Sequence, residues 1–97
     1  MNLVYLQACV VELKPLRYTP AGIPVQELTL EYCSEVLEAG HTRKVEFVLS
    51  ACAIGQLAMP ISQLSLGVMI RVEGFLAPAR KSSNKLVLHI QSVQGIQ

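Results

Sequence analysis

Apolar and polar residues alternate along four stretches of the chain, as is typical of strands with one buried face, and a fifth stretch is apolar on both faces in part. The first stretch is rich in valine and other apolar residues, as β-strands are. The five expected strands cover residues 3–13, 25–33, 43–49, 67–76 and 85–93. Their expected core-facing positions are Val4, Leu6, Ala8 and Val10, then Leu28, Leu30 and Tyr32, then Val45, Phe47 and Leu49, and then Val68, Ile70 and Val72. The pattern therefore predicts a protein built almost entirely of β-strands.

The connections between these strands differ in length and stiffness. Residues 14–24 hold three prolines and a glycine, so we expect a stiff, sharply turned loop there. Residues 34–42 are polar, and a wide hairpin loop fits them better than a single helical turn. Residues 50–66 have no clean period, and we expect a connection with one short helical turn near residues 53–57. The last connection, residues 77–84, is polar and basic.

Five short strands with one long break after the third predict an all-β fold, the five-stranded Greek-key barrel known as the OB-fold. The break between the third and fourth strands holds at most the short helical turn. A small barrel of another five- or six-stranded kind is the alternative. The chain has 97 residues, the size of one domain, so we expect residues 1–97 to form a single OB-fold domain.

Composition narrows the class of protein further. Hydrophobic residues make up 52% of the chain and charged residues 15%, which argues against disorder and favours self-association through surplus apolar surface. No apolar run approaches the roughly 18 residues of a membrane span, and no basic segment precedes Cys9 as a secretory signal requires. We therefore expect a cytoplasmic protein without a membrane segment. The widely spaced Cys9, Cys33 and Cys52 are expected to be reduced thiols.

Catalytic and cofactor sites are not predicted. The chain has no aspartate, and its two histidines, His41 and His89, lie far apart in the sequence. A lone histidine among apolar strand residues, such as His89, is more often structural than catalytic. No nucleophile has a base at a recognisable spacing, no glycine-rich phosphate loop is present, and no Cys/His cluster has metal-ligand spacing. We therefore expect a protein that is not an enzyme and that carries no metal and no cofactor.

The basic residues are unevenly placed, although the formal net charge is only +1. Seven of the eight fall in the first loop, at the start of the third strand and around the last loop. In an OB barrel the first and last loops border the face of strands two and three, along which single-stranded nucleic acid lies. The candidate nucleic-acid-binding residues, with one aromatic residue of the first loop, are Lys14, Arg17, Tyr18, Arg43, Lys44, Arg80, Lys81 and Lys85. Solvated loop lysines without a function are the plainer alternative.

The same face carries few groups that could stack on bases. The outward positions of the second and third strands are Glu27, Thr29, Glu31, Lys44, Glu46 and Val48. None of these is aromatic, whereas stacking contributes about 1–3 kcal/mol per base in single-strand binding proteins. We therefore expect weak binding of single-stranded nucleic acid. The alternative is a protein-interaction adaptor with vestigial DNA binding, and an RNA-binding cold-shock-like barrel would need the aromatics that this face lacks.

Three segments resemble the primosomal replication protein N family, PriB, namely PLRYTPAGIPVQELTLEY (residues 15–32), VEGFLA (72–77) and KLVLHIQSVQ (85–94). The similarity runs in order along nearly the whole chain, and its most specific part is the S/T-P-x-G-I-P motif at residues 19–24. The chain departs from the family's well-known members at three aligned positions. Those members carry a tryptophan where this chain has Glu46 and an aromatic residue where it has His41. They carry an arginine where this chain has Cys33.

The resemblance implies a homodimer of OB-folds, without enzymatic activity, that binds single-stranded DNA and takes part in the restart of replication forks. It implies as partners the helicase PriA, which the family stimulates, in some bacteria DnaT, and the related single-stranded DNA-binding protein. Matching basic positions carry over from the family to Arg17, Arg43, Arg80, Lys81 and Lys85. The missing aromatics imply weaker DNA binding than in those members.

Overall fold

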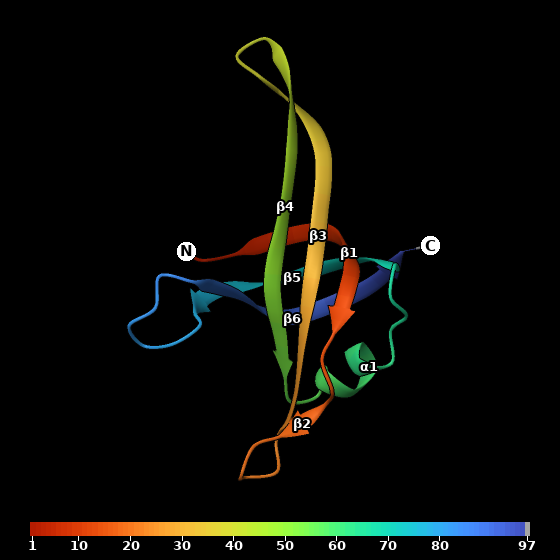
Figure 1. Cartoon of the computed structure of the whole chain (residues 1–97), viewed down its shortest axis with the longest axis vertical. Helices are drawn as coiled ribbons and strands as arrows, with labels where there is room; N and C mark the ends of the chain where they lie inside the picture. Colours follow the sequence, from red (N-terminus) through yellow and green to blue (C-terminus); the bar gives the residue numbers. More distant parts are fainter. Residues whose placement is uncertain (97) are drawn as a thin grey trace.

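The computed structural model describes residues 1–96, and strands make up most of it (Figure 1). The elements in chain order are β1 (Val4–Leu13), β2 (Arg17–Tyr18), β3 (Pro24–Glu38), β4 (His41–Ile54), α1 (Ala58–Ser62), β5 (Met69–Pro78) and β6 (Leu86–Ile96). The strands wrap around one another, and β3 and β4 continue beyond the rest as a long two-stranded hairpin (Figure 1). No helix within residues 1–96 is long and apolar enough to cross a membrane.

Strand β1 closes the sheet into a barrel because it pairs with two different strands. From Val4 to Cys9 it pairs antiparallel with β5, and from Cys9 onward it pairs antiparallel with β3. The register of the β1–β3 ladder shifts between Val10 and Glu12, just after the strand has changed partner at Cys9. The other neighbours are β5–β6 and β3–β4, which are antiparallel, and β4–β6, which is parallel. The predicted five-stranded barrel is therefore confirmed, and the two-residue β2 extends its edge beside β3.

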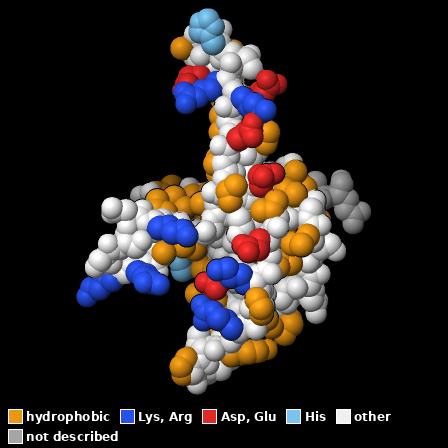
Figure 2. Space-filling model, viewed as in Figure 1, with side chains coloured by type: hydrophobic (Ala, Val, Ile, Leu, Met, Phe, Trp, Pro, Cys, Tyr) orange, Lys and Arg blue, Asp and Glu red, His pale blue; other side chains and the backbone are white. Residues whose placement is uncertain are grey.

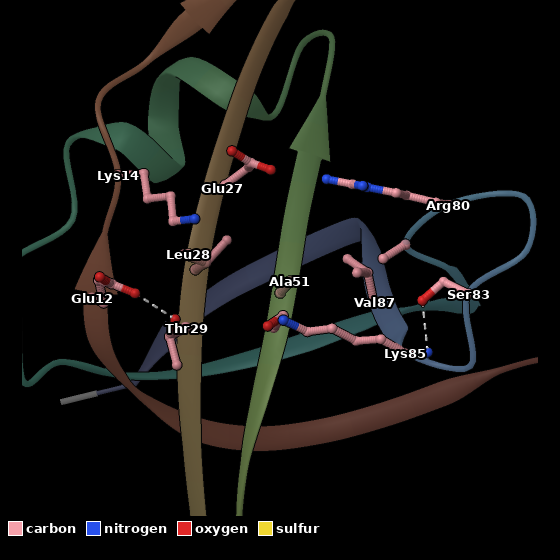
Figure 3. A pocket seen from close by; sticks show the side chains of 12 residues that line it. Glu12, Lys14, Glu27, Leu28, Thr29, Ala51, Arg80, Ser83, Lys85 and Val87 are labelled. Carbon is pink, nitrogen blue, oxygen red and sulfur yellow. Dashed lines mark hydrogen bonds between the residues drawn. The ribbon is translucent and has the colours of Figure 1, made fainter.

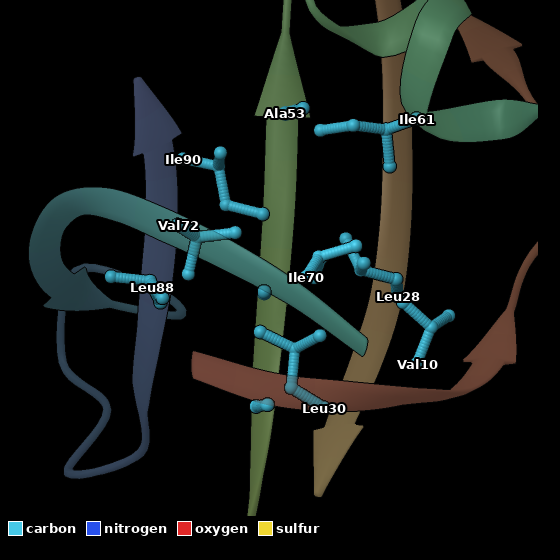
Figure 4. Close-up of a cluster of buried hydrophobic side chains, with 11 residues drawn as sticks. Val10, Leu28, Leu30, Ala53, Ile61, Ile70, Val72, Leu88 and Ile90 are labelled. Atoms are coloured by element: carbon cyan, nitrogen blue, oxygen red, sulfur yellow. The ribbon is translucent and has the colours of Figure 1, made fainter. Parts of the chain in front are cut away.

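Aliphatic side chains from all five long strands fill the barrel (Figure 4). Leu30, Ile70 and Leu88 come from three different strands, and each is fully buried. The predicted alternation places Leu30 and Ile70 correctly, because successive side chains of a strand point to opposite faces. No core face was predicted for the strand that holds Leu88. Ala53 leaves room for Ile61, which the helix inserts beside it (Figure 4). The predicted core faces of β1 and β5, and of Leu28 and Leu30 on β3, are confirmed, and α1 adds Ile61. The prediction for the third expected strand was wrong: Val45 and Phe47 lie outside the core, and Phe47 is 40% exposed, because β4 enters the barrel only further along, where Ala51 and Ala53 are buried.

Helix α1 lies later in the chain than expected. The helical turn was expected near residues 53–57, but β4 continues to Ile54 and the helix begins at Ala58. The prediction was wrong because Ala51, Cys52 and Ala53 are small and all buried, so this part of the strand shows no alternation. The helix buries Ala58 and Ile61, which lie on one face because they are three residues apart.

The connection between β3 and β4 is also corrected by the structure. Residues 34–42 were expected as a wide loop, but they continue both strands up to a two-residue turn at Ala39 and Gly40. Both turn residues have positive φ, 52° and 80°, as a type I′ hairpin requires. Residues 32–47 form strand ladders only with one another within the described chain, and we call them the hairpin arm. Exposure of both arm faces weakens the hydrophobic pattern that would have revealed the strands.

Candidate nucleic-acid interface

A groove of about 610 Å³ lies on the outer face of β3 and β4 (Figure 3). Its floor includes Thr29 and Ser50, which face each other across the β3–β4 ladder. Lys14 borders the groove on the β1 side, whereas Arg80 and Lys85 reach toward β4 from the loop that joins β5 to β6 (Figure 3). We call this hollow the basic groove. It is the face that the first and last loops were predicted to border.

The proline-rich segment holds β2 beside β3 and so positions its basic residue. Oγ1 of Thr19 accepts a hydrogen bond from the backbone N–H of Ile23 at 3.1 Å, and the backbone N–H of Thr19 donates to the Ile23 carbonyl at 2.9 Å. Gly22 completes the turn with a φ of 83°, a conformation that suits glycine. The turn brings Nε of Arg17 to 3.6 Å from the carboxylate of Glu27.

Lys14 is fixed through its backbone. Its N–H donates to the carbonyl of Glu27 at 3.0 Å, and its own carbonyl accepts from Nε2 of Gln26. Gln26 is a buried polar side chain, 1% exposed, and its amide is satisfied by these carbonyls. Sequence reasoning missed this role, because a glutamine at a strand start reads as a solvent-facing residue.

Hydrogen bonds also shape the loop between β5 and β6. The N–H of Ala79 donates to the Lys85 carbonyl at 2.8 Å and closes the base of the loop. Ser83 donates its N–H to the Arg80 carbonyl at 2.9 Å, and its Oγ accepts from the N–H of Lys85 at 2.9 Å. Arg80 and Lys85 therefore stand at the two ends of an ordered loop and line the groove. Lys81 is exposed and does not line it.

The charges of the groove differ from those of the hairpin arm. On the arm, blue basic and red acidic side chains lie close together, whereas blue side chains alone gather on the β5–β6 loop and blue and red ones are mixed over the barrel (Figure 2). The ion pairs within residues 1–96 are Arg17–Glu27, Arg43–Glu38 and Lys44–Glu46, at 3.6, 2.7 and 2.9 Å. In the same part of the chain, Lys14, Arg80 and Lys85 have no acidic partner within 4.0 Å. These three cations are available to an external anion without the loss of an ion pair.

The eight candidate residues do not share one site. Arg43 and Lys44, expected as a basic loop at the start of a strand, lie inside β4 close to the tip of the hairpin arm. At about 3.3 Å per strand residue, Lys44 is roughly 20 Å from Ser50 in the groove floor. Tyr18 is 57% exposed and lines none of the hollows described here. The structure thus brings together Lys14, Arg80 and Lys85 and sets Arg17 beside them.

Two stacked aromatic rings lie next to the groove, and one of them belongs to His89, which was expected to be structural. The rings of Phe75 and His89 are nearly parallel, with centroids 4.9 Å apart and an interplanar angle of 10°. Nδ1 of His89 lies 3.5 Å from Sγ of Cys52. Burial raises the pKa of the Cys52 thiol, with a further increase from Glu27 and a decrease from Arg17, so the thiol is protonated at neutral pH. Strand register alone brings these residues together, and no spacing in the sequence reveals it.

Metal-binding geometry is not found in the described part of the chain. No group of three or more His, Cys, Asp or Glu side chains within residues 1–96 is placed to hold a metal ion. Cys9 is half-buried, Cys33 exposed and Cys52 buried, and all three are free thiols. The polar residues of the groove therefore remain the candidates for ligand binding.

Known relatives were compared with this chain by sequence. Residues 2–92 match a family model described as "another single-strand binding protein family". The chain is 50% identical over 96 residues to the replication restart protein PriB of Bordetella pertussis, across 99% of this chain and 90% of the relative. It is 37% identical over 95 residues to PriB of Nitrosomonas europaea, across 98% of this chain and 88% of the relative.

Solved structures agree with the sequence relatives. PriB of Ralstonia solanacearum matches with a TM-score of 0.89 and 33% identity, across 100% of this chain and 99% of that one. The single-stranded DNA-binding protein of Thermus aquaticus matches with a TM-score of 0.80 and 24% identity, across 100% of this chain and 50% of that one. The second match shows a shared fold, which confirms the OB-fold prediction. The chain belongs to the PriB family of replication restart proteins.

Proposed function

We propose that this chain binds single-stranded DNA as an accessory protein of replication restart. One observation carries the proposal: Lys14, Arg80 and Lys85 converge on one groove without ion pairs within the described chain. Phosphate groups are the ligands that such a set of cations favours, and their contacts release counterions from the nucleic acid. The relatives are named replication restart proteins and the matching family is one of single-strand binding proteins, which supports the same class of ligand.

The groove favours backbone contacts over base contacts. Hydroxyl groups of Ser50 and Ser83 can add hydrogen bonds to phosphate oxygens, whereas the Thr29 hydroxyl already donates to the carboxylate of Glu12 at 2.8 Å. Its lining includes no aromatic side chain, so stacking on the groove floor is not available. We therefore propose weak, sequence-tolerant binding. Lys81 and Tyr18 act at the margins of the groove, and Arg43 and Lys44 form a separate contact on the hairpin arm.

The wider role follows from the family. We propose that the protein acts in the cytoplasm as a homodimer without a reaction of its own. In that role it delivers single-stranded DNA to the helicase PriA and raises its activity, in company with DnaT where that protein exists and with the single-stranded DNA-binding protein. The exposed glutamates Glu31 and Glu46 beside the DNA face favour a second candidate, an adaptor that acts on the helicase through protein contacts.

The test is a titration of fluorescently labelled oligo-dT and of duplex DNA, followed by anisotropy at low and physiological salt. We expect preference for the single strand and affinity that falls with salt. Alanine at Arg80, Lys81 and Lys85 should reduce the slope of log affinity against log salt by about two, since each phosphate contact contributes roughly 0.7. The control Arg71→Ala removes a cation that lies outside the groove.

Two outcomes would contradict the assignment. Unchanged affinity in the triple variant would exclude the basic groove as the binding site. No binding by the unaltered protein at either salt would exclude the function itself. The adaptor is tested with variants that abolish DNA binding: stimulation of PriA that survives in them would establish the adaptor, and stimulation that disappears together with DNA affinity would exclude it.

A further inference from the structure

A row of outward side chains crosses the barrel next to the basic groove. Phe75 on β5 faces His89 on β6 in the ladder, and His89 in turn lies beside Cys52 on β4. Cys52 is paired with Glu27 on β3, and Glu27 holds Arg17 at 3.6 Å. The row therefore connects an aromatic pair to a basic side chain along one band of the surface.

Two hollows along this row continue the basic groove. The first, about 310 Å³, shares Glu27 and Val87 with the groove. The second, about 240 Å³, shares His89 and Ile54 with the first and is bordered by Phe75. Ile54 is 53% exposed, so this last hollow offers an open apolar wall. A polymer that leaves the basic groove past Glu27 thus meets an aromatic surface.

The ring pair can accept a flat ligand. Phe75 and His89 are both half-buried, so part of each ring remains open to solvent. A nucleobase stacks favourably on such rings, and its sugar would then lie near the first hollow. Arg17 lines that hollow, and its exposed pair with Glu27 is weak enough to exchange for a phosphate.

The thiol of Cys52 lies against one nitrogen of the His89 ring and leaves the other nitrogen free to face a ligand. Because burial keeps this thiol protonated, its S–H can donate to Nδ1 of His89 across the 3.5 Å contact. In the ring tautomer that accepts this bond, Nε2 carries the proton. Within residues 1–96, Nε2 has no hydrogen-bond partner and no buried side-chain polar atom is left unsatisfied, so Nε2 reaches solvent as a donor. Its natural acceptor is a carbonyl oxygen on the edge of a base.

We propose that Phe75 and His89 form a nucleobase subsite that takes one carbonyl-bearing base, such as thymine, from the strand held in the basic groove. This inference rests on the proposed function and deepens it. It supplies, on the side of the barrel, the stacking surface that the groove floor lacks.

The test uses a tryptophan in place of the phenylalanine, because the chain has no tryptophan of its own. Stacking of a base on the indole of Phe75→Trp should quench its fluorescence during titration with oligo-dT. The control Tyr5→Trp places the same reporter on β1, outside all three hollows, and should show no quenching. Anisotropy of labelled oligo-dT is recorded in parallel to show that both variants bind.

Two further variants measure the energy of the subsite. Phe75→Leu keeps an apolar side chain and should lower oligo-dT affinity roughly five- to tenfold. His89→Leu should reduce the ratio of oligo-dT affinity to oligo-dA affinity relative to the unaltered protein. The self-stacking of oligo-dA affects both proteins equally, so a change in this ratio reports on the histidine. Circular dichroism confirms that each variant is folded.

The outcomes separate the subsite from the function on which it rests. Bound oligo-dT without quenching of Phe75→Trp, or with full affinity in Phe75→Leu, would overturn the subsite while the basic groove stands. No binding by the unaltered protein would overturn the proposed function and the subsite together.

Discussion

Gly74 is the single residue on which the geometry of β5 and β6 depends most directly. A Cβ atom at this position would overlap the backbone carbonyl of His89, and the register between the two strands shifts between Glu73 and Gly74. A glycine inside an alternating strand pattern signals such a close approach. The sequence alone does not reveal that the neighbouring atom is the carbonyl oxygen of His89, because this depends on the register between β5 and β6.

Substitution of this glycine by alanine is predicted to destabilise the fold. Gly74→Ala should cost about 1–3 kcal/mol in free energy of unfolding, since a backbone group must move to make room. Urea denaturation measures the change. Gly95→Ala is the matched control, because a Cβ there meets nothing within 4 Å, and we expect it to stay within about 0.5–1 kcal/mol of the unaltered protein. Equal losses in both variants would contradict the close approach at His89.

At the scale of elements, the hairpin arm holds the least favourable backbone conformation of the chain. Ala39 has a φ of 52° and is the one non-glycine residue with positive φ among those described. The left-handed conformation costs a residue with a Cβ about 1–2 kcal/mol, and asparagine tolerates it better. We expect Ala39→Asn to stabilise the arm and to slow amide hydrogen exchange along residues 32–47. Ala39→Val should accelerate exchange there, and no difference between the two would exclude the type I′ turn.

The same element shows where sequence reasoning succeeded and where it failed. Leu28 and Leu30 revealed the buried half of β3, since one face of the strand enters the core. The arm was missed because Leu37 is 76% exposed and both faces meet solvent, which removes the pattern. The turn was missed because Ala39-Gly40 lacks the Asn-Gly or Asp-Gly pair that marks such hairpins.

At the scale of the whole molecule, the charge pattern was predicted in part. The first and last loops do border one face, so Lys14, Arg80 and Lys85 meet as expected. Arg43 and Lys44 were assigned to the same surface because the arm was not foreseen, and there each pairs with a glutamate. The sequence alone does not distinguish basic residues without an ion pair from basic residues that pair with a glutamate of the same hairpin.

The unpaired edge of β1 leads us to predict that two copies of the chain associate. Residues 4–8 pair with β5 on one side, and on the other side no strand within residues 1–96 pairs with them, because β3 joins only at Cys9. Leu3 and Tyr5 are exposed nearby, at 57% and 66%. An unpaired, apolar strand edge favours addition of a second strand, and a second β1 related by a twofold axis supplies one.

Sedimentation at micromolar concentration should therefore show a species of twice the 10.6 kDa chain mass. Tyr5→Lys should shift the equilibrium toward the single chain, because a twofold axis would bring the two added charges close together while each stays solvated in the monomer. Val48→Lys, at a residue that is 63% exposed on β4 and outside this edge, adds the same charge as a control and should leave association unchanged. A single species of 10.6 kDa for the unaltered protein would refute the dimer. In that event the edge of β1 would be open to a partner other than a second copy.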